Sequence, residues 1–382
     1  CIDFKYLVII SNIYIIGRHQ TQRDGIKLEA GGGNEMRWMK CVLALVLCLS
    51  LAMMLALGSG SYPNTIVDDA NRTITIEKPV DKIIPLVTWS YEPLCLLGAE
   101  DKIAGITSDA QTSFPWLSGI KNKPIVGTYR EHDYEKIIEI QPDIIITQAR
   151  FASNLENNLS GIKVVVLDFS NQEGFERDLT LLAELVGGQE KAASFLEWRS
   201  EQLGILQEKI GSLKSDEKKR VYIEWSNSPW LTAGVSSAKD TLITRAGGLN
   251  IAHNFTAPRP MVDPEWVLKE NPQAIVYSAT LPISELLTGY YVNNTDIAKK
   301  YLEKEKSRDG LKGTDAVTED HLYVLDQICV EATRNFIGAQ YLAKWLYPEK
   351  FGDLDPEAVH KEYFEKWLGM PFKGIWAYPR ES

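Results

Sequence analysis

Two segments of the chain, 130 residues apart, share one pattern of polar and apolar positions. Residues 133–146 read DYEKIIEIQPDIII, and residues 263–276 read DPEWVLKENPQAIV. In each segment an aspartate precedes a short amphipathic stretch of helical period, a proline follows, and an apolar run ends the unit. A proline cannot continue a helix, and an unbroken apolar run suits a strand buried on both faces of a parallel sheet. The pattern predicts one helix–turn–strand unit in each of two similar lobes.

Short apolar runs alternate with amphipathic stretches in both halves of the chain. The order is typical of an α/β fold with parallel sheets. A hairpin is predicted over 65–78, and strands are predicted at 83–87, 103–107, 125–126, 144–147, 164–167, 221–225, 274–278 and 322–325. The main predicted helices span 91–97, 175–186, 191–213, 240–246, 336–345 and 356–367.

A long helical pattern separates the two repeats. Residues 191–213 contain no proline and keep helical spacing, which gives a rod of roughly 35 Å at 1.5 Å per residue. We therefore expect one rigid helix to join an N-terminal lobe to a C-terminal lobe. The predicted boundaries are 62–174 for the first lobe, 175–214 for the linking helical region and 215–382 for the second lobe with its terminal helices.

The first 61 residues carry a different pattern. Met36 and Lys40 precede an uncharged apolar run at 41–57, and small residues follow at 58–61. This order predicts a secretory signal over 36–61. The run of about 17 residues is at the short limit for a membrane span, so an uncleaved N-terminal anchor is the alternative. Residues 1–35 show no fold pattern, and we interpret them as an upstream segment translated from a start assigned too early.

Composition narrows the function. The chain carries a net charge of −10, whereas nucleic-acid binding needs clustered lysine and arginine. After residue 61 only Cys95 and Cys329 remain, so no disulfide framework is expected. The four histidines of this part do not cluster with cysteines or carboxylates, so no directly bound metal ion is predicted. No cofactor is predicted either.

Several motifs occur in a family-specific order. They are KIIPLVTWSYEPLCLLGAEDKIAGIT at 82–107, VGTYR at 126–130, AGGLNIA at 246–252 and the two repeats. Over about residues 65–346 the chain resembles the periplasmic (class III) substrate-binding proteins of ABC importers for iron–siderophore, haem or cobalamin. The resemblance implies two Rossmann-like lobes joined by a single long helix, with ligand in the cleft between them. It also implies an exported, non-enzymatic protein that delivers a metal chelate to a permease dimer with its ATPase. A glutamate on each lobe would pair with permease arginines, and Glu135 and Glu265 hold those positions.

The expected cleft is rich in aromatic and arginine side chains. Ligands of open α/β sheets bind beyond the carboxyl ends of the strands. Aromatic faces suit a flat organic ligand, and arginine suits carboxylate or catecholate oxygens. The residues predicted to bind ligand on this basis are Trp89, Ser90, Tyr91, Tyr129, Arg130, Arg150, Phe151, Trp225, Trp230, Arg259 and Arg334.

Each of these residues also has an ordinary structural interpretation. Trp89 and Trp225 suit a core at strand ends, and Arg334 has Glu331 and Asp326 nearby in sequence. Three functions therefore compete: the binding protein of an importer, an exported enzyme on a chelatase-like two-lobed fold, and a surface adhesion protein. The sequence contains no G-x-G-x-x-G after a strand and no Walker loop, which favours the binding protein. An iron–siderophore-type chelate is the expected ligand, with cobalamin or haem as the alternative.

Overall fold

The computed structural model describes residues 62–280 and 286–380. The predicted upstream segment (1–35) and the signal or anchor (36–61) lie outside the described residues. Within the described ranges, every helix is too short or too polar to cross a membrane.

The first lobe is built on a three-stranded parallel sheet with the order β3-β4-β5. Its strands are β3 (Ile83–Pro85), β4 (Ile144–Thr147) and β5 (Lys163–Val166), and the antiparallel hairpin β1 (Asn64–Val67) with β2 (Thr73–Ile76) precedes them. The main helices of this lobe are α3 (Tyr91–Leu96), α4 (Ser108–Ser113), α5 (Tyr134–Ile140) and α6 (Ala149–Asn158).

Two of the strands predicted in this lobe do not form, and these two predictions are wrong. Residues 103–107 and 125–126 form only single bridges, from Ile103 to Ile83 and from Ile106 to Ile125. Pro124 has no N–H to donate, so the pairing beside Ile125 cannot extend in that direction.

The second lobe contains a five-stranded sheet with the order β10-β9-β8-β6-β7, parallel except for β10. Its strands are β6 (Arg220–Trp225), β7 (Leu249–Asn250), β8 (Ala274–Ala279), β9 (Leu322–Asp326) and β10 (Ala377–Tyr378). Its helices are α9 (Ala238–Arg245), α10 (Pro264–Glu270), α11 (Asp296–Lys306), α12 (Asp315–Thr318) and α13 (Gln327–Glu331).

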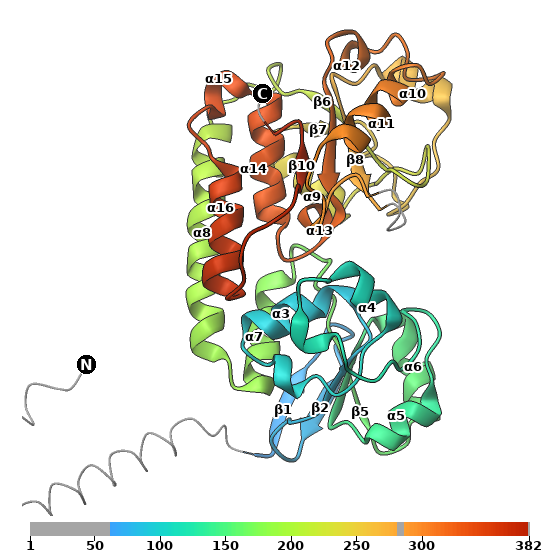
Figure 1. Ribbon diagram of the computed structural model, residues 1–382, viewed down its shortest axis with the longest axis vertical. Helices are drawn as coiled ribbons and strands as arrows, with labels where there is room; N and C mark the ends of the chain where they lie inside the picture. Colours follow the sequence, from blue (N-terminus) through green and yellow to red (C-terminus); the bar gives the residue numbers. More distant parts are fainter. Residues whose placement is uncertain (1–61, 281–285, 381–382) are drawn as a thin grey trace, which may run out of the picture. The chain divides into compact units, whose positions relative to one another are not determined.

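A helical layer connects the lobes, as Figure 1 shows. The chain passes from the first lobe through α7 (Phe175–Val186) and the 22-residue α8 (Gln189–Ile210) into the second. The predicted linking helix is therefore present. α14 (Asn335–Leu346) packs against α8, and α16 (Pro356–Glu362) packs against α14; α15 (Pro348–Phe351) and a π turn at Tyr363–Trp367 complete this region.

The two lobes share one apolar core. A single cluster of buried residues includes Leu94 of the first lobe, Phe195 and Trp198 of α8, and Val276 and Phe336 beyond it. Smaller clusters fill the other face of each sheet. The connection between the lobes is therefore a packed interior, with α8 as one of its walls.

The two repeats fold alike. The N-cap aspartates Asp133 and Asp263 each accept a hydrogen bond from a backbone N–H of the first turn of α5 or α10. Both helices end at a residue in the left-handed region, Gln141 at φ 51° and Asn271 at φ 46°. Proline follows in each case and leads into the buried strands β4 and β8. The predicted helix–turn–strand units are confirmed.

Candidate ligand-binding site

Two hollows lie between the lobes and meet at Trp89. The first has a volume of about 330 Å³ and the second about 370 Å³. Both are at the carboxyl ends of the strands, where ligands of open α/β sheets bind. Trp89 follows β3, is half-buried and lines both hollows. The residues that both lobes contribute to the first hollow include Trp89, Tyr129, Gln148 and Asp168 with Trp225, Lys239, Arg259 and Glu331.

Two cations lie over the indole of Trp225 in the first hollow. The Nζ atom of Lys239 is 3.6 Å from the ring centroid, and the guanidinium carbon of Arg259 is 5.2 Å from it. Lys239 is buried and pairs with Glu331, and burial lowers the pKa of its ammonium to about 8. Arg259 is exposed and has no ion pair among the residues that the structure describes. Arg259 is therefore the cation that remains available to an anionic ligand.

The wall from the first lobe is polar and aromatic. The hydroxyl of Tyr129 donates a hydrogen bond of 3.0 Å to Oε1 of Gln148, and Arg150 donates to the same oxygen at 2.7 Å. The guanidinium of Arg150 also lies 4.7 Å from the ring centroid of Phe151. Tyr129 and Gln148 line the hollow, whereas Arg150 and Phe151 contact these two residues without lining it. The structure thus brings these predicted residues together.

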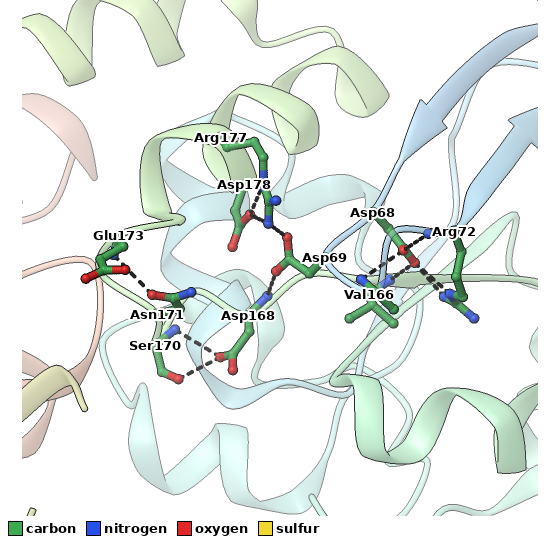
Figure 2. A network of polar contacts seen from close by, with 11 residues as sticks. Asp68, Asp69, Arg72, Val166, Asp168, Ser170, Asn171, Glu173, Arg177 and Asp178 are labelled. Carbon is green, nitrogen blue, oxygen red and sulfur yellow. Dashed lines mark hydrogen bonds and ion pairs between the residues drawn. The ribbon is translucent and has the colours of Figure 1, made fainter. Parts of the chain in front are cut away.

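The floor of the first hollow is fixed by a network that starts in the β1–β2 turn (Figure 2). The N–H of Asp168 donates to Oδ2 of Asp69 at 2.8 Å, and Asp68 accepts a bond of 3.0 Å from the N–H of Val166. Arg177 of α7 bonds to Asp69 and reaches Asp178 at 3.2 Å. These contacts hold the end of β5, and with it Asp168, against α7.

Asp178 is the member of this network with an unsatisfied buried oxygen. Its side chain is fully buried, and Oδ2 has no hydrogen-bond partner. Burial raises the pKa of this carboxyl to about 7, although the Arg177 guanidinium opposes the shift. The carboxyl therefore titrates near neutral pH.

The second hollow is more aromatic, and none of its lining residues within 62–280 and 286–380 is a lysine or an arginine. Trp116 and Trp376 stand in one wall with ring centroids 5.2 Å apart. Thr288 donates a hydrogen bond of 2.9 Å to Oδ2 of Asp326, a buried carboxyl whose pKa is raised by burial. Tyr291 projects from the second lobe and donates a bond of 3.2 Å to the carbonyl of Pro115 in the first. This hollow suits a neutral part of a ligand.

Four residues predicted to bind ligand lie elsewhere. Ser90 and Tyr91 are fully buried, and their hydroxyls donate to the carbonyls of Val87 and Pro85. Trp230 is half-buried, packs against the core of the second lobe and lines neither hollow; the guanidinium carbon of Arg308 lies 4.2 Å from its ring centroid. These positions correct the prediction, because strand ends mark an edge of the sheet and not the direction of each side chain.

Arg334 is the fourth correction. It is 0% exposed and pairs with Glu92 of the first lobe, with Nη2 3.0 Å from Oε1. Its expected local partners are occupied: Glu331 pairs with Lys239, and Asp326 bonds to Thr288. Arg334 therefore fastens the lobes together inside the protein and does not face the hollows.

The remaining predicted residues are on the surface. Arg130 is exposed beside Tyr129 and lines neither hollow. Glu135 on α5 and Glu265 on α10 are exposed, and Figure 1 shows both helices on the side away from α8.

Sequence reasoning missed Lys239, Asp168 and the aromatic side chains of the second hollow. Lys239 is the second residue of α9, two positions after the N-cap Ser237. Its partner Glu331 is 92 residues away, so no local spacing could pair the two.

Comparison with known proteins decides the family. The model of the periplasmic binding protein family matches residues 86–329. The chain belongs to this family. It is accordingly a substrate-binding protein of the kind that serves ABC transporters outside the cytoplasm.

Individual relatives are distant and differ in ligand. The uncharacterized ABC transporter substrate-binding lipoprotein YvrC of Bacillus subtilis is 28% identical over 300 residues, which cover 76% of this chain and 87% of YvrC. The vitamin B12-binding protein of Salmonella typhimurium is 29% identical over 154 residues, which cover 40% of this chain and 57% of that protein. The structure of MolA from Haemophilus influenzae bound to molybdate superposes with a TM-score of 0.67 at 17% identity, covering 81% of this chain and 99% of MolA. At 17% identity, the similarity to MolA shows a shared two-lobed fold and says nothing about a shared ligand.

Proposed function

We propose that this binding protein captures an anionic, flat organic chelate of a metal, of the iron–siderophore type, and delivers it to the permease of an ABC importer. The observation that supports this most directly is the first hollow, where Arg259 lies over Trp225 and Trp89 and Tyr129 stand on the opposite lobe. Aromatic faces bind the organic part, and the guanidinium binds carboxylate or catecholate oxygens.

A metal that enters already chelated fits the available side chains. Among the residues that the structure describes, no group of three or more histidine, cysteine, aspartate or glutamate side chains is placed to hold a bare ion. The two hollows that meet at Trp89 each fall at the lower end of the range of about 300–1,000 Å³ for small-molecule sites. A chelate can place its anionic part near Arg259 and its neutral part in the second hollow.

The test is a native mass spectrum and an absorbance scan of protein purified from its own host, followed by titration with defined probes. We expect a ferric tris-catecholate to bind and free ferric ion to leave the protein unchanged. If only cyanocobalamin or haemin binds, the protein is a binding protein for that ligand and not for a siderophore-type chelate. If only molybdate binds, the proposed organic chelate is wrong. Chemical conversion of the bound probe would favour the enzyme alternative.

Delivery rests on the two exposed glutamates. Neither Glu135 nor Glu265 has an ion-pair partner within 62–280 or 286–380, and the two occupy the same position in their repeats. Two separated carboxylates on a rigid body can meet one cation on each subunit of a two-fold symmetric permease. The double variant Glu135→Ala, Glu265→Ala should bind ligand normally and dock poorly, because neither side chain lines a hollow.

A further inference from the structure

The two repeats share more than a glutamate. Residues 133–140 and 263–270 have the same sequence of exposed, intermediate and buried positions, residue for residue. The buried member of each series, Ile137 or Val267, is explained by packing, since it is 0% exposed in the core of its lobe. The residue after it is Ile138 in α5 and Leu268 in α10, and these are 52% and 42% exposed.

These two apolar side chains lie beside the glutamates. Ile138 is three positions after Glu135, and Leu268 is three positions after Glu265, so each pair shares one face of its helix. A single exposed leucine or isoleucine on a protein surface needs no explanation. An exposed branched apolar side chain three positions after a glutamate that has no ion pair among the described residues, once in each lobe, is a repeated surface and not an isolated side chain.

We infer that Ile138 and Leu268 form the apolar half of the docking surface, and that each permease subunit offers a cation next to an apolar socket. This inference rests on the proposed delivery to an importer. Charge complementarity identifies the partner, because each lobe presents next to its apolar residue a carboxylate that no cation within 62–280 or 286–380 pairs with. The repeat identifies the symmetry, because two equal surfaces on one chain match two equal subunits of a dimer. The carboxylates steer the encounter and set the register, and the apolar pair supplies contact that salt does not screen.

The test uses the full binding protein and the purified permease–ATPase complex of its host in lipid nanodiscs. Docking and ligand affinity are measured on the same preparations. The test variant is Ile138→Gln with Leu268→Gln. The matched control is Ile205→Gln with Leu249→Gln, because Ile205 on α8 and Leu249 at the start of β7 are 40% and 44% exposed and lie outside the repeats.

We expect the test pair to weaken docking by about 25-fold, or about 5-fold for each side chain, because burying the exposed half of one such side chain accounts for a factor of that size. Ligand affinity and thermal stability should match the unmodified protein, and the control pair should dock normally. At 1 M salt the screening length falls to about 3 Å, so the unmodified protein should keep part of its docking and the test pair should lose it.

Normal docking of the test pair, or an equal loss in the control pair, would overturn the inference while leaving delivery to the permease intact. Failure of the unmodified protein to dock at all would instead overturn the proposed function. A photo-crosslinker attached at position 138 or at position 268 gives a second measurement. The two sites should label the same permease peptide, and labelling of unrelated peptides would contradict the symmetric surface.

Discussion

Replacing Arg334 with methionine should destabilise the protein strongly and leave its ligand affinity almost unchanged. The guanidinium donates to Glu92 at 3.0 and 3.3 Å and contacts Nε2 of His360 at 2.8 Å. Both Arg334 and Glu92 are fully buried, so removal of the cation leaves a buried carboxylate without its ion-pair partner, although it keeps the hydrogen bond of 3.1 Å from the hydroxyl of Tyr363. Breaking one side of a buried ion pair costs about 3–5 kcal/mol, a large part of the 5–15 kcal/mol that stabilises a typical domain.

The assay is thermal and urea unfolding at several pH values. Burial already raises the pKa of Glu92, and loss of Arg334 should raise it further. A carboxyl with a raised pKa in the folded state contributes stability at low pH that is lost as pH rises through that pKa. The deficit of the variant should therefore be smaller at pH 5 than at pH 8. At neutral pH we expect a fall in melting temperature of roughly 6–10 °C.

A double variant separates the ion pair from the packing. Glu92→Leu with Arg334→Met should recover much of the loss, because replacing both members of a buried pair by apolar residues is often neutral. An unchanged melting temperature in the single variant would refute the reasoning. A strong loss of ligand affinity with normal stability would show that Arg334 takes part in ligand binding, as the sequence predicted.

Three further predictions concern separate parts of the molecule. Asp178→Asn should stabilise the protein by about 1–3 kcal/mol at pH 8 and have no effect at pH 4. The reason is that a carboxyl with a folded-state pKa of about 7 loses its contribution to the stability of the fold as pH rises through neutrality. Urea unfolding at both pH values checks this. Arg259→Ala should weaken binding of an anionic chelate by about 1.5–3 kcal/mol, whereas Arg130→Ala should not, as calorimetric titration would show; equal effects would move the anion site out of the first hollow. Ligand should change the radius of gyration only slightly, since the lobes share a core, and a large drop in small-angle scattering would contradict this.

The fold was predictable where it depends on local sequence. α5 and α10 follow from a capping aspartate, an apolar period and a proline, all within fourteen residues of chain. The long helix follows from an uninterrupted period. The bridges at Ile103 and Ile106 could not be told from strands, because an apolar run does not reveal whether its neighbours offer hydrogen-bond partners.

The site was predictable only in part, because its decisive pairs are distant in sequence. Trp89, Trp225 and Arg259, which line the first hollow, were proposed from their places after strands or in loops near them. Arg334 pairs with Glu92, which is 242 positions away in the sequence. The sequence suggested only the nearby Glu331 and Asp326 as its partners. Lys239 was missed for the same reason, since nothing in its own segment shows that Glu331 will neutralise it.

The shared interior also bears on the use of this protein as a biosensor. Many sensors place a fluorophore on each domain and report the change in distance when ligand closes a hinge. Here Phe195 and Trp198 of α8 are buried in the same cluster as residues of both sheets, so that distance has little freedom to change. A single environment-sensitive dye at the rim of the first hollow, close to Trp89, would report occupancy without any need for the domains to move.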